Sequence, residues 1–518
     1  MELKIMASKI KELLQIDNIN DLPKKLLCIL EDEKYTDIFD RYIKIVGDLE
    51  IDYMQKCYQF WLADRGVGTK QQDYTPPSIS KLVAKMANCK DGGTVYDCCC
   101  GSGSLTIAAW KNNNSLKFVC EELDSNVIPV LLFNLAIRGI DATVVHGDAL
   151  KNEIYETWKL TRQNQYSIIK KINGFVHGYY DACISNPPYN IRWEPPIDSG
   201  LFGADERFSH CVIPPASNAN YAFVLHCAAR LKENGKAVMI LPNGIQSANG
   251  IEKEIRRYLL ENGLISSLIA MPDKMFESTS IPTCLLTLHN GRSDKQVFVV
   301  DARKEYCEEI RDQRGEGSKS HAMRVYHKAM KVFSSDNITA IVNAVSEKND
   351  IGGFSKLIAI NDIRDQDWII SPSRYIESKE EPSVHRPYID IVRDLNNIAK
   401  EKGAVKITMN ETLAKRIGFA EIAEAVQNDD EIVDGINNGL IKILGLEPLE
   451  KSKYITVSKK AGEIKIENMS KDSVSSIFAI FMPIFKQHIY YLNNRENELL
   501  MELRDAVLPE LMSGKISI

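Results

Sequence analysis

Four short β-rich segments, each ending in polar residues, constrain the fold of this chain more than any other feature. They cover residues 94–97, 116–121, 144–148 and 181–185, and a helical pattern over 105–110 follows the first of them. Such strands in a doubly wound sheet bring their carboxyl ends to one edge, where these folds bind ligands. The sequence therefore predicts an α/β fold with a ligand site at that edge.

The first segment runs into a glycine turn, Asp97-Cys-Cys-Cys-Gly-Ser-Gly103. Small residues before a helix start let free backbone N–H groups approach a ligand closely. A lone Gly-x-Gly is a weak signal, and both the third glycine of the dinucleotide fingerprint and the lysine of a P-loop are missing here. The candidate binding residues of the turn are Asp97, Gly101, Ser102 and Gly103. Alternatively, Asp97 bonds only the amides of the turn.

Acidic residues at the next two strand ends strengthen the case for a nucleoside ligand. Glu121 or Glu122 is placed to accept hydrogen bonds from both ribose hydroxyls, and Asp148 from an adenine amine. The alternatives are that Glu122 is a solvated strand end and that Asp148 caps the following helix.

The fourth strand ends in Asn186-Pro187-Pro188-Tyr189, which predicts a site for methylation of a planar amine. The side-chain carbonyl of Asn186 and the backbone carbonyl of Pro187 can accept from the two hydrogens of a ring amine. Two prolines stiffen the turn, and Tyr189 offers a flat face on which a flipped base can stack. Alternatively, the prolines form only a turn that closes a buried strand.

These motifs resemble those of the γ-class adenine-N6 DNA methyltransferases, and within them the modification subunit of type I restriction enzymes. The resemblance runs from about residue 72 to about residue 376 and includes Asp73-Tyr-Thr-Pro-Pro77. The spacing from Glu122 to Asn134 is similar to the family's, which favours Glu122 over Glu121. The resemblance implies S-adenosylmethionine as cofactor and a Rossmann-like fold. It adds Tyr74, Thr75 and Pro76 to the cofactor site, because the family's matching segment folds over the cofactor methionine, and it counts Asn186 in the cofactor site as well as in the catalytic one. Alternatively, Thr75 is only a turn or cap residue.

The resemblance also implies the substrate and the partners. The substrate is the N6 amino group of an adenine in double-stranded DNA, and the partners are a specificity subunit, a second copy of the chain and a restriction subunit. No segment between residues 305 and 381 is long enough for a target-recognition domain, so recognition is expected from another chain. The alternatives are a stand-alone DNA adenine methyltransferase, an enzyme acting on RNA or protein glutamine, and a catalytically silent scaffold.

The chain departs from the family's usual motif at four positions. Cys98 and Cys99 replace Pro and Ala, Ser104 replaces Gly, and Tyr189 stands where Phe is more frequent. The first two changes cost loop stiffness rather than a functional group, because the family's cofactor contacts there are made chiefly by the backbone.

The composition predicts a large, cytoplasmic, multi-domain enzyme. The chain has 518 residues, 44% of them hydrophobic, and a net charge of -6, so DNA contact requires a local basic patch or a partner. No apolar run of membrane-spanning length and no signal peptide are apparent. All 12 cysteines lie at or before Cys307 without Cys-x-x-Cys spacing, which predicts reduced thiols and no metal site.

Four regions are expected along the chain. They are a helical N-terminal domain (1–70), the methyltransferase catalytic domain (71–305), a helical extension of the core (306–380) and a mainly helical C-terminal region (381–518). Residues 303–320 are expected to be a connector.

The end of the chain resembles the closing helix of type I specificity subunits. Its apolar stripe predicts docking on the coiled coil of such a subunit, or alternatively packing within its own domain. The stripe consists of Leu492, Leu499, Leu503, Val507 and Leu508.

Overall fold

The protein divides into two compact units, Met1–Lys379 and Glu380–Ile518, each described by itself. The computed structural model describes residues 3–16, 21–32, 35–57, 75–195, 205–208, 211–276, 281–314, 325–376, 386–417, 455–458, 463–466 and 490–512. The finer division into four regions stays a prediction.

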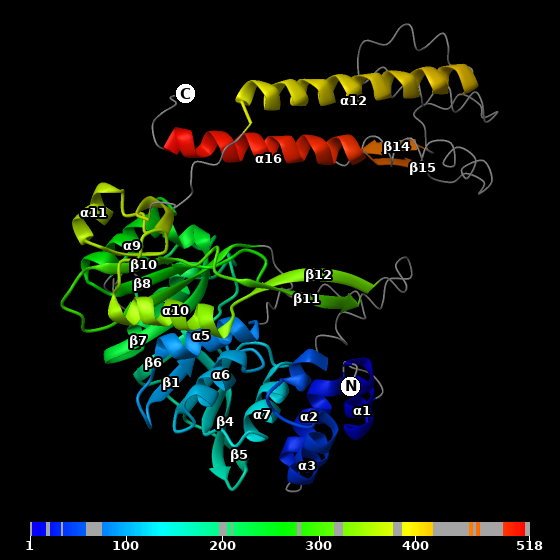
Figure 1. Cartoon of the computed structure of the whole chain (residues 1–518). Helices are drawn as coiled ribbons and strands as arrows, with labels where there is room; N and C mark the ends of the chain where they lie inside the picture. Colours follow the sequence, from blue (N-terminus) through cyan, green and yellow to red (C-terminus); the bar gives the residue numbers. More distant parts are fainter. Residues whose placement is uncertain are drawn as a thin grey trace. The chain divides into compact units, whose positions relative to one another are not determined.

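The first unit is built on one large mixed sheet (Figure 1). Among the described residues the sheet has 11 strands in the order β13-β10-β8-β9-β7-β6-β1-β2-β3-β4-β5. The strands are β1 (Thr94–Asp97), β2 (Lys117–Glu122), β3 (Ala142–Asp148), β4 (Glu153–Gln163), β5 (Tyr166–Ile172), β6 (Tyr180–Ser185), β7 (Leu231–Pro242), β8 (Ile265–Ala270), β9 (Thr283–His289), β10 (Val297–Asp301) and β13 (Ser355–Ile358).

The four strands expected from the sequence are β1, β2, β3 and β6, and they lie side by side and parallel. From β1 the chain adds β2 and β3 on one side and then returns to place β6 on the other side. This reversal of strand order opens a crevice at the carboxyl edge of the sheet, between β1 and β6. The predicted Rossmann-like α/β fold is confirmed.

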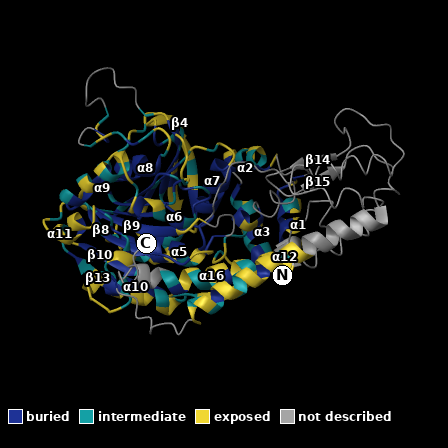
Figure 2. Ribbon diagram, turned by 90° about the horizontal axis from the view of Figure 1, so that it is seen from above, coloured by how far each residue is buried: buried dark blue, intermediate teal, exposed yellow. Residues whose placement is uncertain are grey.

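Helices cover both faces of the sheet, and each face has its own apolar core. In β6, Ala182 and Ile184 belong to one core and Cys183 to the other, as strand alternation requires, and a shift in register between Tyr180 and Ala182 places Tyr180 in the same core as Cys183. All residues of α7 are buried, as are all but one in each of the interior strands β6, β8 and β9 (Figure 2). The helices described in this unit include α1 (Leu3–Leu13), α2 (Leu22–Glu31), α3 (Tyr35–Val46), α5 (Pro77–Ala87), α6 (Ser104–Asn112), α7 (Ile128–Ala136), α8 (Asn220–Ala229), α9 (Ile251–Glu261), α10 (Ser335–Glu347) and α11 (Ile360–Asp365), with 3-10 turns η2 (Asn243–Gln246) and η3 (Pro372–Arg374).

The region after β10 differs from the sequence-based expectation of a connector and a helical extension. It contains an antiparallel hairpin of β11 (Cys307–Arg314) and β12 (Val325–Val332), besides α10, α11 and β13. The hairpin was missed because β11 is mostly charged, whereas its backbone hydrogen bonds to β12 do not depend on apolar side chains.

The second unit contains two paired helices, α12 (Tyr388–Ile417) and α16 (Tyr490–Met512), and a short hairpin of β14 (Ile455–Ser458) and β15 (Glu463–Ile466). Arg386 forms an ion pair with Glu502, and Lys402, further along α12, forms one with Glu496, which lies earlier in α16, so the helices are antiparallel. The apolar residues buried between them are Ile391, Ile398, Leu492 and Leu499. Part of the predicted apolar stripe thus packs within its own unit.

None of the helices within the described ranges is both long and apolar enough to cross a membrane.

Candidate active site

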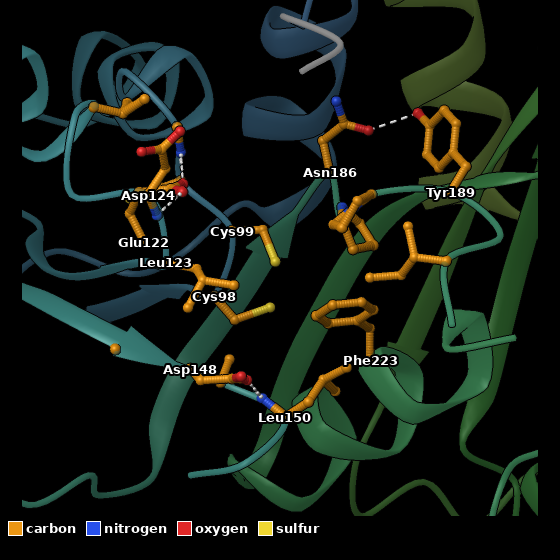
Figure 3. A pocket seen from close by; sticks show the side chains of 18 of the residues that line it. Cys98, Cys99, Glu122, Leu123, Asp124, Asp148, Leu150, Asn186, Tyr189 and Phe223 are labelled. Carbon is orange, nitrogen blue, oxygen red and sulfur yellow. Dashed lines mark hydrogen bonds between the residues drawn. The ribbon is translucent and has the colours of Figure 1, made fainter. Parts of the chain in front are cut away.

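A cavity of about 540 Å³ lies at the carboxyl edge of β1, β2, β3 and β6 (Figure 3). Its wall includes the loop after β1, Glu122 at the end of β2, Asp148 at the end of β3 and the turn after β6. The fold thus brings together side chains that are up to about ninety positions apart in the sequence, because they follow neighbouring parallel strands.

Most of the residues proposed from the sequence line this cavity. Those on the wall are Thr75, Gly101, Ser102, Glu122, Asp148, Asn186, Pro187, Pro188 and Tyr189. Pro76, Asp97 and Gly103 are not among the wall residues, and Tyr74 lies outside the described residues.

Asp97 and Gly103 support the glycine loop from behind. Asp97 is buried, accepts a hydrogen bond from the Thr106 hydroxyl (3.3 Å) and lies 3.4 Å from the backbone nitrogen of Cys99. Burial raises the pKa of Asp97 well above its ordinary value. Gly103 has a φ of 96°, and a Cβ there would lie 3.0 Å from Leu131 Cδ1. Both residues therefore shape the loop instead of facing a ligand.

Ser102 offers the cavity an unused donor. Its carbonyl accepts from Asn134 Nδ2 (3.0 Å), which also donates to Asp52 (2.8 Å) and so fixes the loop to α7 and the N-terminal part of the unit. Its hydroxyl is buried and has no hydrogen-bond partner among the described residues. Buried hydroxyls are seldom left unbonded, so this group suits a ligand atom.

Glu122 joins the loop to the end of β2. Its carboxylate accepts from the backbone N–H groups of Gly101 (2.9 Å) and Asp124 (2.8 Å), and burial raises its pKa. Glu121, by contrast, points away into a buried network, where it accepts from the Tyr96 hydroxyl and lies 3.3 Å from His177 Nε2. Of the two candidates, the structure places Glu122 on the cavity wall.

Asp148 is held by the turn that follows it. Its Oδ1 accepts from the backbone N–H groups of Leu150 (3.0 Å) and Lys151 (3.1 Å). The element that follows is the strand β4, so Asp148 stabilises a turn and does not cap a helix as in the alternative, and the same bonds fix a carboxylate at the wall of the cavity (Figure 3).

Arg207, which the sequence did not reveal, anchors this same turn from the other side. Its guanidinium donates to the carbonyls of Ala149 (2.6 Å) and Leu150 (2.7 Å). It is paired with Asp205 and lies 2.9 Å from His226 Nδ1. Burial lowers the pKa of His226 to about 3, so this histidine is neutral near pH 7.

Asn186 is fixed at both ends of its amide. Its Nδ2 donates to Thr75 Oγ1 (3.1 Å), and its Oδ1 accepts from the Tyr189 hydroxyl (2.6 Å), as Figure 3 shows for the tyrosine. A carbonyl oxygen has two lone pairs, so Oδ1 can accept from the tyrosine and from an amine together. The Tyr189 ring meets Phe276 edge-on, with centroids 6.4 Å apart.

Cysteines form part of the wall. Cys98, Cys99 and Cys100 all line the cavity, and Cys98 Sγ lies 3.2 Å from Ser185 Oγ. Within the described ranges, no three His, Cys, Asp or Glu side chains are grouped so that they could hold a metal ion.

Apolar wall residues complete the cavity and were not foreseen. Leu123 follows Glu122 directly and is 56% exposed in the structure; a leucine next to an acidic strand end was the signal in the sequence that could have indicated an apolar contact. The other unforeseen apolar wall residues include Val127, Trp193 and Phe223.

The arrangement suits two planar, polar ligands side by side. Carboxylates and a glycine loop at one end fit a nucleoside, and an amide oxygen in a stiff turn at the other end fits an exocyclic amine.

Comparisons with known proteins agree with this geometry. A model of the N-6 DNA methylase family matches residues 49–383. The chain is similar to the type I restriction enzyme MpnII methylase subunit of Mycoplasma pneumoniae, with 27% identity over 346 residues, or 64% of this chain and 58% of that protein. It is also similar to the MjaIX methylase subunit of Methanocaldococcus jannaschii, with 26% identity over 390 residues, or 70% of this chain and 64% of that protein.

A crystal structure shares the fold. It is that of the type I restriction-modification system methyltransferase subunit from Streptococcus thermophilus, with a TM-score of 0.52, 23% identity and coverage of 72% of this chain and 80% of that chain. The matches span less than two thirds of the length of the two curated relatives.

Proposed function

The chain belongs to the N-6 DNA methylase family, because the family model matches more than half of the chain, and we propose that the chain methylates the N6 amino group of a flipped adenine in DNA. The methyl donor is S-adenosylmethionine. The observation that carries the proposal is a single cavity that holds both a nucleoside-type carboxylate, Glu122, and the amide of Asn186 in its Pro-Pro turn.

The wall residues suit this cofactor. Glu122 is placed for the ribose hydroxyls, Asp148 for the adenine amine, and the unbonded hydroxyl of Ser102 for a polar cofactor atom. A Cβ at Gly101 would meet nothing within 4 Å, so the backbone there is open to a ligand. Bound at this wall, the cofactor supplies a methyl group already activated on a sulfonium.

The protein's own task is to align and polarise the amine. Asn186 Oδ1 and the Pro187 carbonyl accept from the two N6 hydrogens, which draws the nitrogen lone pair out of conjugation with the ring. Tyr189 stacks on the flipped base and holds Asn186 in place. Transfer is then a direct in-line displacement, for which alignment can contribute ~7 to 11 kcal/mol.

We also propose that the chain is the modification subunit of a type I restriction-modification complex. Its partners are a specificity subunit, a second copy of the chain and a restriction subunit. The names of the relatives support this assignment, since each is a type I methylase subunit.

The specificity subunit docks on the helices of the second unit. The face of α16 that carries Leu492 and Leu499 already packs on α12, so docking uses other side chains. Large apolar residues remain exposed on both helices, which is typical of an interaction surface. They are Ile389, Val392, Tyr491, Leu500 and Met501.

A co-purification experiment tests the docking. Replacing Leu500 and Met501 together by Glu is expected to abolish co-purification with the specificity subunit, whereas Asn497→Glu, an exposed change on the same helix, should leave it intact. Unchanged co-purification after deletion of residues 488–518 would exclude the docking.

The activity is tested by mapping N6-methyladenine in the genomic DNA of the host with and without this gene, by single-molecule sequencing. Loss of methylation at a split, gapped motif, restored by the wild-type gene and not by Asn186→Ala, is the expected result. Loss at a short continuous motif would favour a stand-alone enzyme, and no loss at any motif would contradict the proposed substrate.

A further inference from the structure

A second cavity lies at the opposite edge of the sheet, where the parallel strands β7 and β8 begin. Its floor consists of side chains on one face of the sheet. Ser267 of β8 lies opposite Thr287 of β9, and His289 of β9 lies opposite Lys236 of β7. Opposite residues share a face, as do residues two apart in a strand, so these four side chains form one polar patch.

The walls are the carboxyl ends of two helices. The cavity, of about 470 Å³, is bordered by Lys85 and Met86 near the end of α5 and by Val345 and Lys348 at the end of α10. The helices α5 and α10 contact each other and lie on the same face of the sheet (Figure 1). This volume is in the usual range for a small-molecule site.

Two buried hydroxyls on the floor have no partner. Ser267 is 1% exposed and Thr287 is 4% exposed, and neither side-chain oxygen makes a hydrogen bond within the described part of the chain. Buried hydroxyls are almost always bonded, to protein, water or a ligand. Both hydroxyls can donate to an acceptor placed in the cavity.

The cavity is also strongly basic, although the chain as a whole has a net charge of -6. Four cationic residues line it against one carboxylate, Asp294, which pairs with Arg292 and lies 3.5 Å from Lys348. Lys236 and Arg292 line the cavity with His289, and burial followed by these cations lowers the pKa of His289. The four cations are Lys85, Lys236, Arg292 and Lys348.

The ends of the helices account for only part of this charge. The carbonyl ends of α5 and α10 attract cations, which explains Lys85 and Lys348. This attraction explains neither the unbonded hydroxyls nor the position of Lys236, which lies on the strand β7. The side-chain ammonium of Lys236 makes no hydrogen bond or ion pair to any described residue.

We propose that this cavity binds the phosphate group of a small phosphorylated molecule. Lysine ammonium groups and hydroxyls form strong, charge-assisted hydrogen bonds to phosphate oxygens. Met86, Phe298 and Val345 provide an apolar wall for the rest of the molecule. The cavity of the candidate active site opens at the other edge of the sheet, so this second site is separate from it. The inference therefore does not depend on the proposed function.

Calorimetric titration of the full-length protein tests the site, with inorganic phosphate and with uridine monophosphate as probes at constant ionic strength. S-adenosylhomocysteine is present to occupy the other cavity. Saturable binding of both probes is expected, with tighter binding of the nucleotide because it also contacts the apolar wall. Binding of phosphate alone would indicate a site for the free ion, and binding of neither would overturn the proposal.

Variants locate the binding. Lys236→Met is expected to weaken phosphate binding by about tenfold or more, and Thr287→Val by several-fold, since each removes one donor. Lys295→Met removes a nearby exposed charge outside the cavity and should change nothing. If Lys236→Met does not fold, Thr287→Val remains, because it keeps the shape of the side chain. Equal binding by Thr287→Val and the wild-type protein would place the anion elsewhere.

Discussion

The proposed cofactor end and the proposed amine end of the candidate active-site cavity are held together in different ways. At the cofactor end, the carboxylates of Glu122 and Asp148 are fixed by backbone N–H groups of the loops beside them. At the amine end, Asn186 is fixed by two other side chains, those of Thr75 and Tyr189. A site fixed by the backbone tolerates many side-chain changes nearby, whereas a site fixed by side chains does not. The comparison therefore predicts unequal sensitivity to mutation.

The largest effect is expected for Asn186→Ala. This change removes the acceptor of the amine and the partner of both neighbours, and the loss of one such polarising group typically costs ~10²- to 10³-fold in kcat. Cofactor affinity should stay nearly unchanged. Single-turnover methylation and calorimetry with S-adenosylmethionine measure the two quantities, with the exposed Asn114→Ala as control. Parallel loss of affinity and rate would mean that the two ends are not separate.

Glu122→Gln is expected to act mainly on cofactor affinity. It keeps the shape of the side chain but removes the charge that accepts the ribose hydroxyls, so Kd should rise by about tenfold. Burial raises the pKa of Glu122 above its ordinary value of 4.5, so in the wild-type protein this carboxylate is protonated at a higher pH than an exposed glutamate is.

The pH dependence of cofactor affinity distinguishes the effect of the charge on Glu122 from the effect of its shape. The ionised form of Glu122 is the acceptor, so wild-type affinity should fall as the pH is lowered through the raised pKa, and the Gln variant should lack this fall. The same fall in both proteins would assign the titration to another group.

Tyr189→Phe is expected to have an intermediate effect on the rate. The ring that stacks on a base remains, but the hydrogen bond to Asn186 Oδ1 is lost, and a bond of this kind is worth ~0.5 to 1.5 kcal/mol. A fall of about two- to tenfold in kcat is expected, against a larger fall for Tyr189→Ala. An unchanged rate in the Phe variant would show that Thr75 alone orients Asn186.

The sequence predicted what depends on local patterns. We foresaw the strands β1, β2, β3 and β6 and the polar side chains at their ends, because each of these features is encoded within a few residues. The roles of Asp97 and Gly103 were not resolved, because a motif does not say which of its residues face the ligand. The hairpin β11–β12 was missed because its charged strand pairs through the backbone.

Arg207 could not be predicted for a different reason. Its partners Ala149 and Leu150 lie 58 and 57 positions away, and it contacts them through their carbonyls, which every residue type possesses. No pattern in the sequence marks such a contact, although it fixes the turn that carries Asp148.

Arg207→Lys is expected to weaken cofactor binding by about threefold to tenfold with little change in kcat. Lysine cannot donate to both carbonyls in the same fixed fork, so the turn after Asp148 loosens. Calorimetry with S-adenosylmethionine measures the affinity, and added guanidinium should partly restore it in Arg207→Ala. A fall in kcat at saturating cofactor would instead connect Arg207 to the amine end.

The smallest effect is expected for Cys99→Ala, and it tests the comparison most directly. Cys99 lines the cavity at the cofactor end, where the loop is shaped by bonds to backbone groups, including the bond from Gly101 to Glu122. Removing its sulfur leaves those bonds in place, so cofactor affinity and kcat should both stay within about twofold of the wild-type values. A tenfold loss in either quantity would show that side chains also define the cofactor end. The contrast between the two ends of the cavity would then fail, even if Asn186→Ala behaved as expected.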